Sequence, residues 1–308
     1  MRPVAILLAC LAGCSKPPPP PPAAPPAPST PVSRAVDFLI SQQDGGLWRS
    51  KGDAVLGSGQ ALTPFVLYAL SQAPPETLAR HRPAIEQALD RLPIQGREYP
   101  TYSLALSILA LKKLRPSKDV SGLCRELKSM QLAEELGWSE SDPEYGGWDE
   151  GAITARKPQC QRPNVSVTAF ACEALGGDEK AKKFVERCRG AEGGYLFTPN
   201  AVWAHQNKSG KRGYATATFD AHRILGTPLS YSIRDLPHFL DMPEKWGRSM
   251  VYYQAFAEAK VQPNRTIAEM LLALQQKDGS WVNTSPLMKE DEPLIATGLA
   301  LVAISLSR

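Results

Sequence analysis

Two kinds of helical segment alternate along the chain. The first kind carries apolar residues three and four positions apart among charged ones, as in AIEQALDRL at 84–92, which is typical of a helix with one face in water. The second kind is apolar on nearly every side, which in a globular domain indicates burial by neighbours all around. Segments of the first kind occupy 35–43, 84–92, 123–132, 181–190, 233–242 and 265–276. Those of the second kind follow at 61–70, 101–114, 164–177, 214–226, 248–259 and 293–306.

This pairing repeats six times between residues 33 and 308, with a mean period of about 46 residues. An open superhelix of such pairs would need polar terminal repeats, whereas this chain ends in the apolar run VAISL at 302–306. Apolar ends favour contact with each other. We therefore predict an all-α fold in which six helical hairpins close into a ring, an (α/α)6 toroid, with the apolar helices on the inside.

The two ends of this domain share a turn, because QQDGGLW at 42–48 returns as QQKDGSW at 275–281. These QxxDGxW-type turns and the helix pairs resemble the repeat of squalene–hopene cyclases and protein prenyltransferase β-subunits, the α/α-toroid superfamily, from Val36 onward. The resemblance implies that the turn Gln bonds to exposed backbone at a helix end and that the turn Trp packs over it. These roles fall on Gln43, Trp48, Gln276 and Trp281. Elsewhere a single turn aromatic remains, at Tyr99, Trp148, Tyr195 and Trp246.

The residues with which those relatives act are absent from the sequence. It contains no DxDD motif for protonating an alkene or epoxide, no DDxxD motif for holding magnesium on a diphosphate, and no GCGEQ thioester. The Asp, Cys and His that bind zinc in protein prenyltransferases cannot be assembled, because the corresponding helix, FDAHRILG, has no cysteine and the last inner helix has no histidine. We therefore expect no metal and no organic cofactor.

The fourth apolar segment carries ionisable residues at positions that are apolar elsewhere. When the segments are aligned on a shared Thr, Asp220 and His222 replace Phe, Leu or Cys. A buried carboxylate must be paired, hydrated or used chemically, so Asp220 and His222 are candidate catalytic residues. Residues two apart point about 200° apart on a helix, so both cannot face one cavity. The alternative is an ion pair between Asp220 and Arg223, three residues further on.

Other polar groups near this segment and near the last one are candidates for binding. The candidate ligand-binding residues are Tyr195, Trp203, His205 and Tyr214. The acidic run at 289–292 could bind a cation, and the alternative is that it complements the positive N-terminal ends of helices.

The N-terminal residues predict export and anchoring. Residues 1–13 contain an apolar run too short to span a bilayer, and LAGC at 11–14 resembles a bacterial lipobox in which Cys14 is lipidated. The alternative is an ordinary secretory signal. Residues 14–32 form a linker with ten prolines between 16 and 31, which predicts an extended polyproline stalk. Ser15 after the cysteine favours the outer membrane, so we expect a lipid-anchored, extracytoplasmic domain at 33–308.

Charge and cysteine content narrow the partners further. A net charge of +4 without a dense basic block gives no support for nucleic-acid binding. No CxxC pair occurs, so Cys124, Cys160, Cys172 and Cys188 are expected to be core thiols, or to include one disulfide among the last three.

Two functional hypotheses remain. The first is a binding or scaffold protein that holds an isoprenoid, a glycan or a protein in the central cavity or on the rim. The second is a divergent enzyme, either terpenoid-cyclase-like or a polysaccharide lyase acting on an anionic glycan, for which Tyr195, Tyr214, His205 and His222 would be suitable. The cavity lining distinguishes them: aromatic and wide for an isoprenoid, basic for a glycan, and filled by side chains for a scaffold.

Overall fold

The computed structural model describes residues 29–54, 56–92, 98–151, 162–190, 194–199, 213–229 and 249–307. Over these ranges the regular structure is helical apart from two isolated β-bridges, so the predicted all-α class is confirmed. None of the helices in these ranges has the length and apolar character needed to cross a lipid bilayer. The signal peptide, Cys14 and the predicted helix at 233–242 lie outside the described residues.

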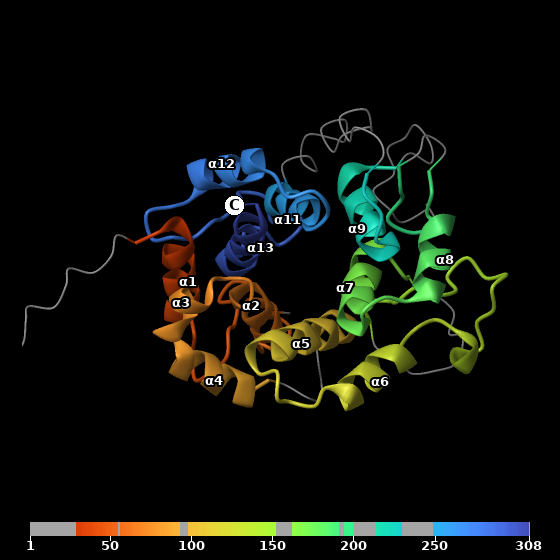
Figure 1. Ribbon diagram of the computed structural model, residues 1–308, viewed down its shortest axis with the longest axis horizontal. Coiled ribbons are helices and arrows are strands. Elements are labelled where there is room, and N and C mark those ends of the chain that lie inside the picture. The colour runs from red at the N-terminus through yellow and green to blue at the C-terminus, as the bar shows by residue number, and fades with distance from the viewer. Residues whose placement is uncertain are drawn as a thin grey trace, which may run out of the picture.

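Six helices coincide with the six predicted apolar segments: α2 (Leu62–Leu70), α5 (Pro100–Leu114), α7 (Val165–Leu175), α9 (Ala215–Leu225), α11 (Val251–Val261) and α13 (Pro293–Leu306). Each packs against the next along the chain, and α13 packs against both α11 and α2 (Figure 1). The approach of α13 to α2 is close, because a Cβ added at Gly298 would lie 2.5 Å from Cε1 of Phe65. The first and last apolar helices are therefore in direct contact.

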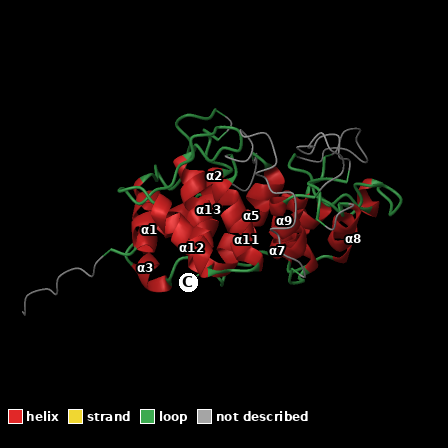
Figure 2. Cartoon of the chain, turned by 90° about the horizontal axis from the view of Figure 1, so that it is seen from above, coloured by secondary structure: helices red, strands yellow, loops and turns green. Residues whose placement is uncertain are grey.

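Five further helices match predicted amphipathic segments: α1 (Pro31–Ser41), α4 (Arg82–Asp90), α6 (Ser121–Ser129), α8 (Glu179–Arg187) and α12 (Arg265–Leu274). They lie around the apolar helices in Figure 1, and we call the two sets outer and inner helices. One apolar side of each faces inward, as where α8 buries Ala181, Phe184 and Val185. The short α3 (Pro75–Ala79) has no signal in the sequence, because five residues are too few to show a helical period. In Figure 2 most loops lie along one side of the helices.

Helix α1 begins at Pro31, inside the segment assigned to the linker. Thr30 is its N-cap, with Oγ1 accepting a hydrogen bond from the Ser33 N–H at 3.1 Å. Proline is favoured in the first turn because its fixed φ suits a helix and its missing N–H has no partner there. The proline-rich sequence thus passes directly into the folded domain.

The turn aromatics join outer to inner helices through two hydrogen bonds. In four repeats the backbone N–H of the turn aromatic donates to the threonine shared by the inner helices: Trp48 to Thr63 (3.0 Å), Trp148 to Thr168 (3.1 Å), Tyr195 to Thr218 (3.0 Å) and Trp281 to Thr297 (3.0 Å). The indole Nε1 donates to a carbonyl at the end of the outer helix: Trp48 to Leu39 (2.6 Å), Trp148 to Leu127 (2.8 Å) and Trp281 to Leu271 (2.8 Å). In these three turns the indole, rather than the Gln amide, therefore satisfies the helix end.

Glutamines at the ends of outer helices reach the next outer helix. The Gln43 amide donates to the Ala84 carbonyl in α4 at 3.0 Å. At the far end of the chain, Gln275 donates to the carbonyls of Pro31 in α1 at 2.8 Å and Gly279 at 3.0 Å. This role was expected of Gln276, whose side chain instead meets the Ser280 hydroxyl at 3.4 Å. Both helices end one residue before the first glutamine of the pair, but the C-cap Gln42 keeps a helical conformation whereas the C-cap Gln275 is extended, so the chain leaves the two helices differently.

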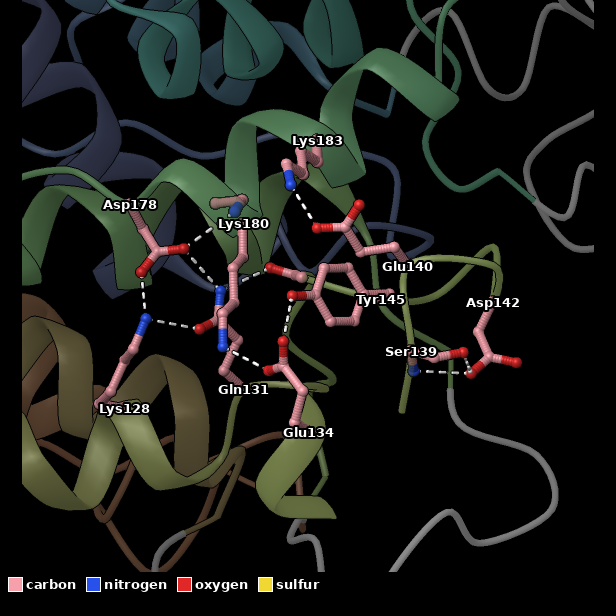
Figure 3. A network of polar contacts seen from close by, with 12 residues as sticks. Lys128, Gln131, Glu134, Ser139, Glu140, Asp142, Tyr145, Asp178, Lys180 and Lys183 are labelled. Atoms are coloured by element: carbon pink, nitrogen blue, oxygen red, sulfur yellow. Dashed lines mark hydrogen bonds and ion pairs between the residues drawn. The ribbon is translucent and has the colours of Figure 1, made fainter. Parts of the chain in front are cut away.

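Residues 132–147, between α6 and α7, form a compact insertion that is attached to α8 (Figure 3). A small apolar cluster holds it together, consisting of Leu132, Ala133, Trp138 and Tyr145. The Tyr145 hydroxyl donates to Glu134 at 2.7 Å, and Lys180 and Lys183 of α8 pair with Glu134 and Glu140. Such exposed ion pairs are individually weak, and Arg187 of α8 adds hydrogen bonds to the carbonyls of Tyr145 at 2.9 Å and Glu140 at 2.8 Å.

Candidate functional site

Asp220 lies in α9 with 1% of its surface exposed. Its Oδ1 accepts a hydrogen bond from Nη1 of Arg223 at 2.6 Å, and its Oδ2 accepts one from the Tyr253 hydroxyl of α11 at 2.7 Å. Burial raises the pKa of Asp220, while the adjacent guanidinium lowers it. The carboxylate is thus ion-paired with Arg223, the alternative that the sequence left open, and a catalytic role for Asp220 stays a prediction.

Arg223 joins two carboxylates on neighbouring helices. Besides Asp220 it donates through Nη2 to Glu173 of α7 at 2.9 Å. Its guanidinium carbon lies 4.6 Å from the ring centre of Phe170 and 5.1 Å from that of Phe256, distances at which a cation is attracted by an aromatic face. Burial disfavours its charge, but the two carboxylates outweigh this and raise the pKa of Arg223. It therefore carries its charge inside the protein.

The polar contacts continue from this arginine in both directions. On one side Glu173 accepts from Lys260 at 2.5 Å, and Lys260 donates to the Tyr68 hydroxyl at 3.3 Å. On the other side the Tyr253 hydroxyl meets Ser166, which also accepts from Tyr102 at 2.8 Å. With Phe170 and Phe256 these side chains form what we call the hub cluster: Tyr68, Tyr102, Ser166, Glu173, Asp220, Arg223, Tyr253 and Lys260.

The hub cluster lies between the inner helices. Its members come from α2, α5, α7, α9 and α11. At its centre, Phe170 stacks on Phe256 with ring centres 5.6 Å apart and 10° between planes, and Tyr68 and Tyr102 meet Phe170 edge-on at 6.0 and 5.6 Å. Its two acids and two bases balance in charge, which is the condition for burying ions without a large penalty.

A small cavity, which we call the mouth cavity, lies where the inner helices begin. Its volume is about 130 Å³, and its lining includes Glu150, Asp220 and the hydroxyl-bearing Tyr102, Tyr214 and Tyr253. A water molecule occupies about 30 Å³ in the liquid, so the cavity holds about four. The Glu150 carboxylate accepts from the Asn164 amide at 3.0 Å, and burial raises its pKa. Pockets for drug-sized ligands start at about 300 Å³, well above this volume.

The other candidate site residues predicted from the sequence do not lie together in one site. Nδ1 of His222 lies 3.0 Å from the Thr227 carbonyl, its ring packs edge-on to Tyr195 at 5.8 Å, and burial lowers its pKa. Tyr195 is the turn aromatic of its repeat, whereas Tyr214 begins α9 and lines the mouth cavity. Trp203 and His205 lie outside the described residues. Asp220 and His222 point in different directions from α9, as expected for residues two positions apart on a helix. The Asp220 carboxylate contacts Tyr253 of α11, whereas the His222 ring contacts Thr227.

The acidic run at 289–292 caps helices. Glu290 accepts hydrogen bonds from the N–H groups of Tyr253 (2.7 Å) and Tyr252 (3.2 Å) at the start of α11. Glu292 caps α13 by accepting from the Leu294 N–H at 3.3 Å. This is the alternative in which carboxylates complement helix N-termini. Among the described residues, no three His, Cys, Asp or Glu side chains gather closely enough to hold a metal ion.

Glu290 makes stability depend on pH. It is 1% exposed, and burial raises its pKa from 4.5 to about 7 despite its N–H donors. A carboxyl whose pKa is raised by folding stabilises the protein most when protonated, so this contribution is lost as pH rises from about 4.5 through 7. We expect the free energy of unfolding to fall by up to about 3 kcal/mol over this range. Denaturation at pH 5 and pH 8 should show this slope, and Glu290→Gln should remove it; identical slopes would contradict the assignment.

Two cysteine residues remain reduced within the core. Cys172 and Cys188 are buried free thiols, and Cys124 is a partly exposed one. A disulfide between Cys172 and Cys188 is therefore wrong, and Cys160 lies outside the described residues. Burial raises the pKa of Cys172 to about 11, which disfavours the reactive thiolate.

The hub cluster is larger than the sequence indicated. Glu173 is the one charged residue of α7, which was a signal of the same kind as Asp220, whereas Lys260 lies at the end of α11, a helix that also carries Glu258. Their pairing through Arg223 requires knowledge of which helices are neighbours, and no sequence spacing supplies that. A scan against models of protein families and a search of curated proteins both find no match for the chain.

Proposed function

We propose that this protein is an extracytoplasmic α/α-toroid, anchored to a bacterial outer membrane through lipidated Cys14, that lacks the usual catalytic motifs and binds a partner. Support for the toroid comes from the order of packing, in which α13 contacts α2, and from the bond between Gln275 and Pro31, which ties α12 to α1. Support for the anchor comes from the lipobox and the proline-rich stalk that leads into α1.

The observation that carries the proposal is the filled hub. An isoprenoid-binding toroid needs a wide apolar cavity between its inner helices, whereas here that space holds ion-paired side chains and the stacked pair Phe170 and Phe256. The mouth cavity of about 130 Å³ is too small for an isoprenoid chain or a sugar oligomer. The hub cluster is therefore assigned to structure, and binding to the outer surface.

The rim around the mouth cavity is the part of that surface best suited to a partner. Tyr99 and Lys289 both have positive φ, at 45° and 61°, which is costly for residues with side chains and is concentrated at functional sites. Tyr99 is 37% and Leu287 43% exposed, and Lys289 pairs with Asp53 of the first turn. The partner is proposed to contact Tyr99 and Leu287 on this rim.

The enzyme alternatives find less support. A lyase would need its tyrosine and histidine to converge on one cavity, but Tyr195 and His222 pack against each other near Thr227, while Tyr214 lines the mouth cavity. No specific contact favours a terpenoid-cyclase reaction, because the buried acid Asp220 is held by Arg223 and Tyr253 rather than presented to a cavity large enough for substrate.

The proposal can be tested on the lipidated full-length protein. Native mass spectrometry should give the mass of a chain beginning at lipidated Cys14, with no isoprenoid or oligosaccharide retained. A photo-crosslinking amino acid at Leu287 should give an adduct of one defined mass in cells. The same group at Lys182 of α8, whose side chain is 39% exposed, is the matched control and should give none. A retained isoprenoid or glycan, or equal crosslinking at both positions, would contradict the proposal.

A further inference from the structure

A second cavity lies at the opposite end of the inner helices from the mouth cavity. It has a volume of about 380 Å³ and is formed where α2, α5 and α13 end, together with α3 and the first residue of α4. We call it the terminal pocket. It contains none of the hub cluster and none of the residues of the rim, so it is a separate site.

One wall of the terminal pocket is apolar. It is built from Ala73, Pro74, Pro75, Leu78, Ala79 and Leu114. Pro74 and Pro75 start α3, where their fixed φ holds the wall in place without a side-chain network. A volume of about 380 Å³ falls within the range of about 300–1,000 Å³ over which small-molecule sites occur.

The other wall presents two cations, Lys113 and Arg82. Lys113 donates to the Gln72 side chain at 3.1 Å and forms no ion pair with a described carboxylate. Arg82 donates to the Leu114 carbonyl at 3.3 Å, which offsets the negative C-terminal end of α5 there, and it also pairs with Glu86.

We propose that the terminal pocket binds a small amphipathic carboxylate of about ten non-hydrogen atoms, with its carboxylate at Lys113 and Arg82 and its apolar chain against Leu78 and Leu114. Lys113 acts as a point charge for the anion, and the Arg82 guanidinium, which is shared with Glu86 and the Leu114 carbonyl, adds positive charge beside it. This site does not depend on the partner-binding function proposed above.

Octanoate is the probe for this site. The full-length chain carrying Cys14→Ser keeps lipid and detergent out of the measurement. Calorimetric titration should show one octanoate per chain with a Kd on the order of 0.1 mM, since a ligand of this size binds weakly. Octanol and octylammonium have the same chain without the negative charge and should bind at least about tenfold more weakly.

Two variants locate the site. Lys113→Gln should weaken octanoate binding about fivefold or more and leave octanol binding unchanged. Lys118→Gln removes the same charge from the exposed loop beyond α5 and should change neither. Leu78→Ser should weaken octanoate and octanol together. Equal binding of octanoate and octanol, several octanoates per chain, or full binding by Lys113→Gln would each overturn the proposal. The mass and crosslinking results at the rim are unaffected by any of these outcomes.

Discussion

Replacing Gly279 by alanine should lower the free energy of unfolding by about 4 kcal/mol. Gly279 has φ +93°, and a Cβ there would lie 2.4 Å from the backbone oxygen of Arg34 in α1. A left-handed backbone costs a residue with a side chain about 1–2 kcal/mol. The clash adds more, because the atom it meets is backbone and can yield only if the last turn moves away from α1. Chemical denaturation of the Gly279→Ala variant measures the loss.

Gly176 supplies the matched control. It has φ +82° at the end of α7, and a Cβ there would meet nothing within 4 Å. Gly176→Ala should therefore carry the backbone cost alone and lose about 1–2 kcal/mol. The difference between the variants reports how tightly the last turn is packed against the first helix. Equal losses of unfolding free energy in the two variants would mean that the last turn is not packed tightly against α1.

Replacing Arg223 by methionine should destabilise the protein by about 3–5 kcal/mol, because removing one member of a buried ion cluster leaves charges uncompensated. Asp220 would lose its only cationic partner among the described residues, and Glu173 would keep Lys260. The pKa of Asp220, already raised by burial, would rise further once the guanidinium is gone. Its folded-state pKa would then lie further above the unfolded one, so the deficit should grow as pH rises, and denaturation at pH 5 and pH 8 would show this.

Removing Asp220 together with Arg223 distinguishes a structural role of Asp220 from a functional one. The double variant Asp220→Leu with Arg223→Met contains no unpaired aspartate, so it should recover most of the stability lost by Arg223→Met alone. If the rim crosslink at Leu287 survives in this variant, Asp220 acts in the fold alone. A double variant that stays as unstable as the single one would show that the pair is not the source of the loss.

The helices were predictable because the spacing of apolar residues along the sequence indicates which sides of each helix are buried. Inner helices such as α13 are apolar on all sides, and outer helices such as α8 are charged on one side, so both kinds and their order follow from the pattern. The boundary at residue 33 misses the true start of α1 at Pro31, since helix capping depends on Thr30 and on a proline that also fits a stalk. The choice of Gln275 over Gln276 depends on one backbone angle that spacing does not reveal.

The candidate site was predictable only in part. Asp220 stands out in the sequence because a carboxylate interrupts an apolar helix, and Arg223 three residues later suggests its partner. The remaining partners come from other helices: Glu173 from α7, and Tyr253 and Lys260 from α11. Their convergence depends on the rotation of each helix about its axis. The terminal pocket has no sequence motif at all, because its walls come from four helices and a connecting loop.

The contact between α2 and α13 is the point on which the proposed ring depends. Selective labelling of phenylalanine and glycine allows the nuclear Overhauser effect between the Phe65 ring and the Gly298 α-protons to be measured in solution. The account predicts a strong effect, because a Cβ at Gly298 would lie 2.5 Å from Cε1 of that ring. Its absence, with both resonances assigned and sharp, would show that the first and last inner helices are apart and that the helices form an open array.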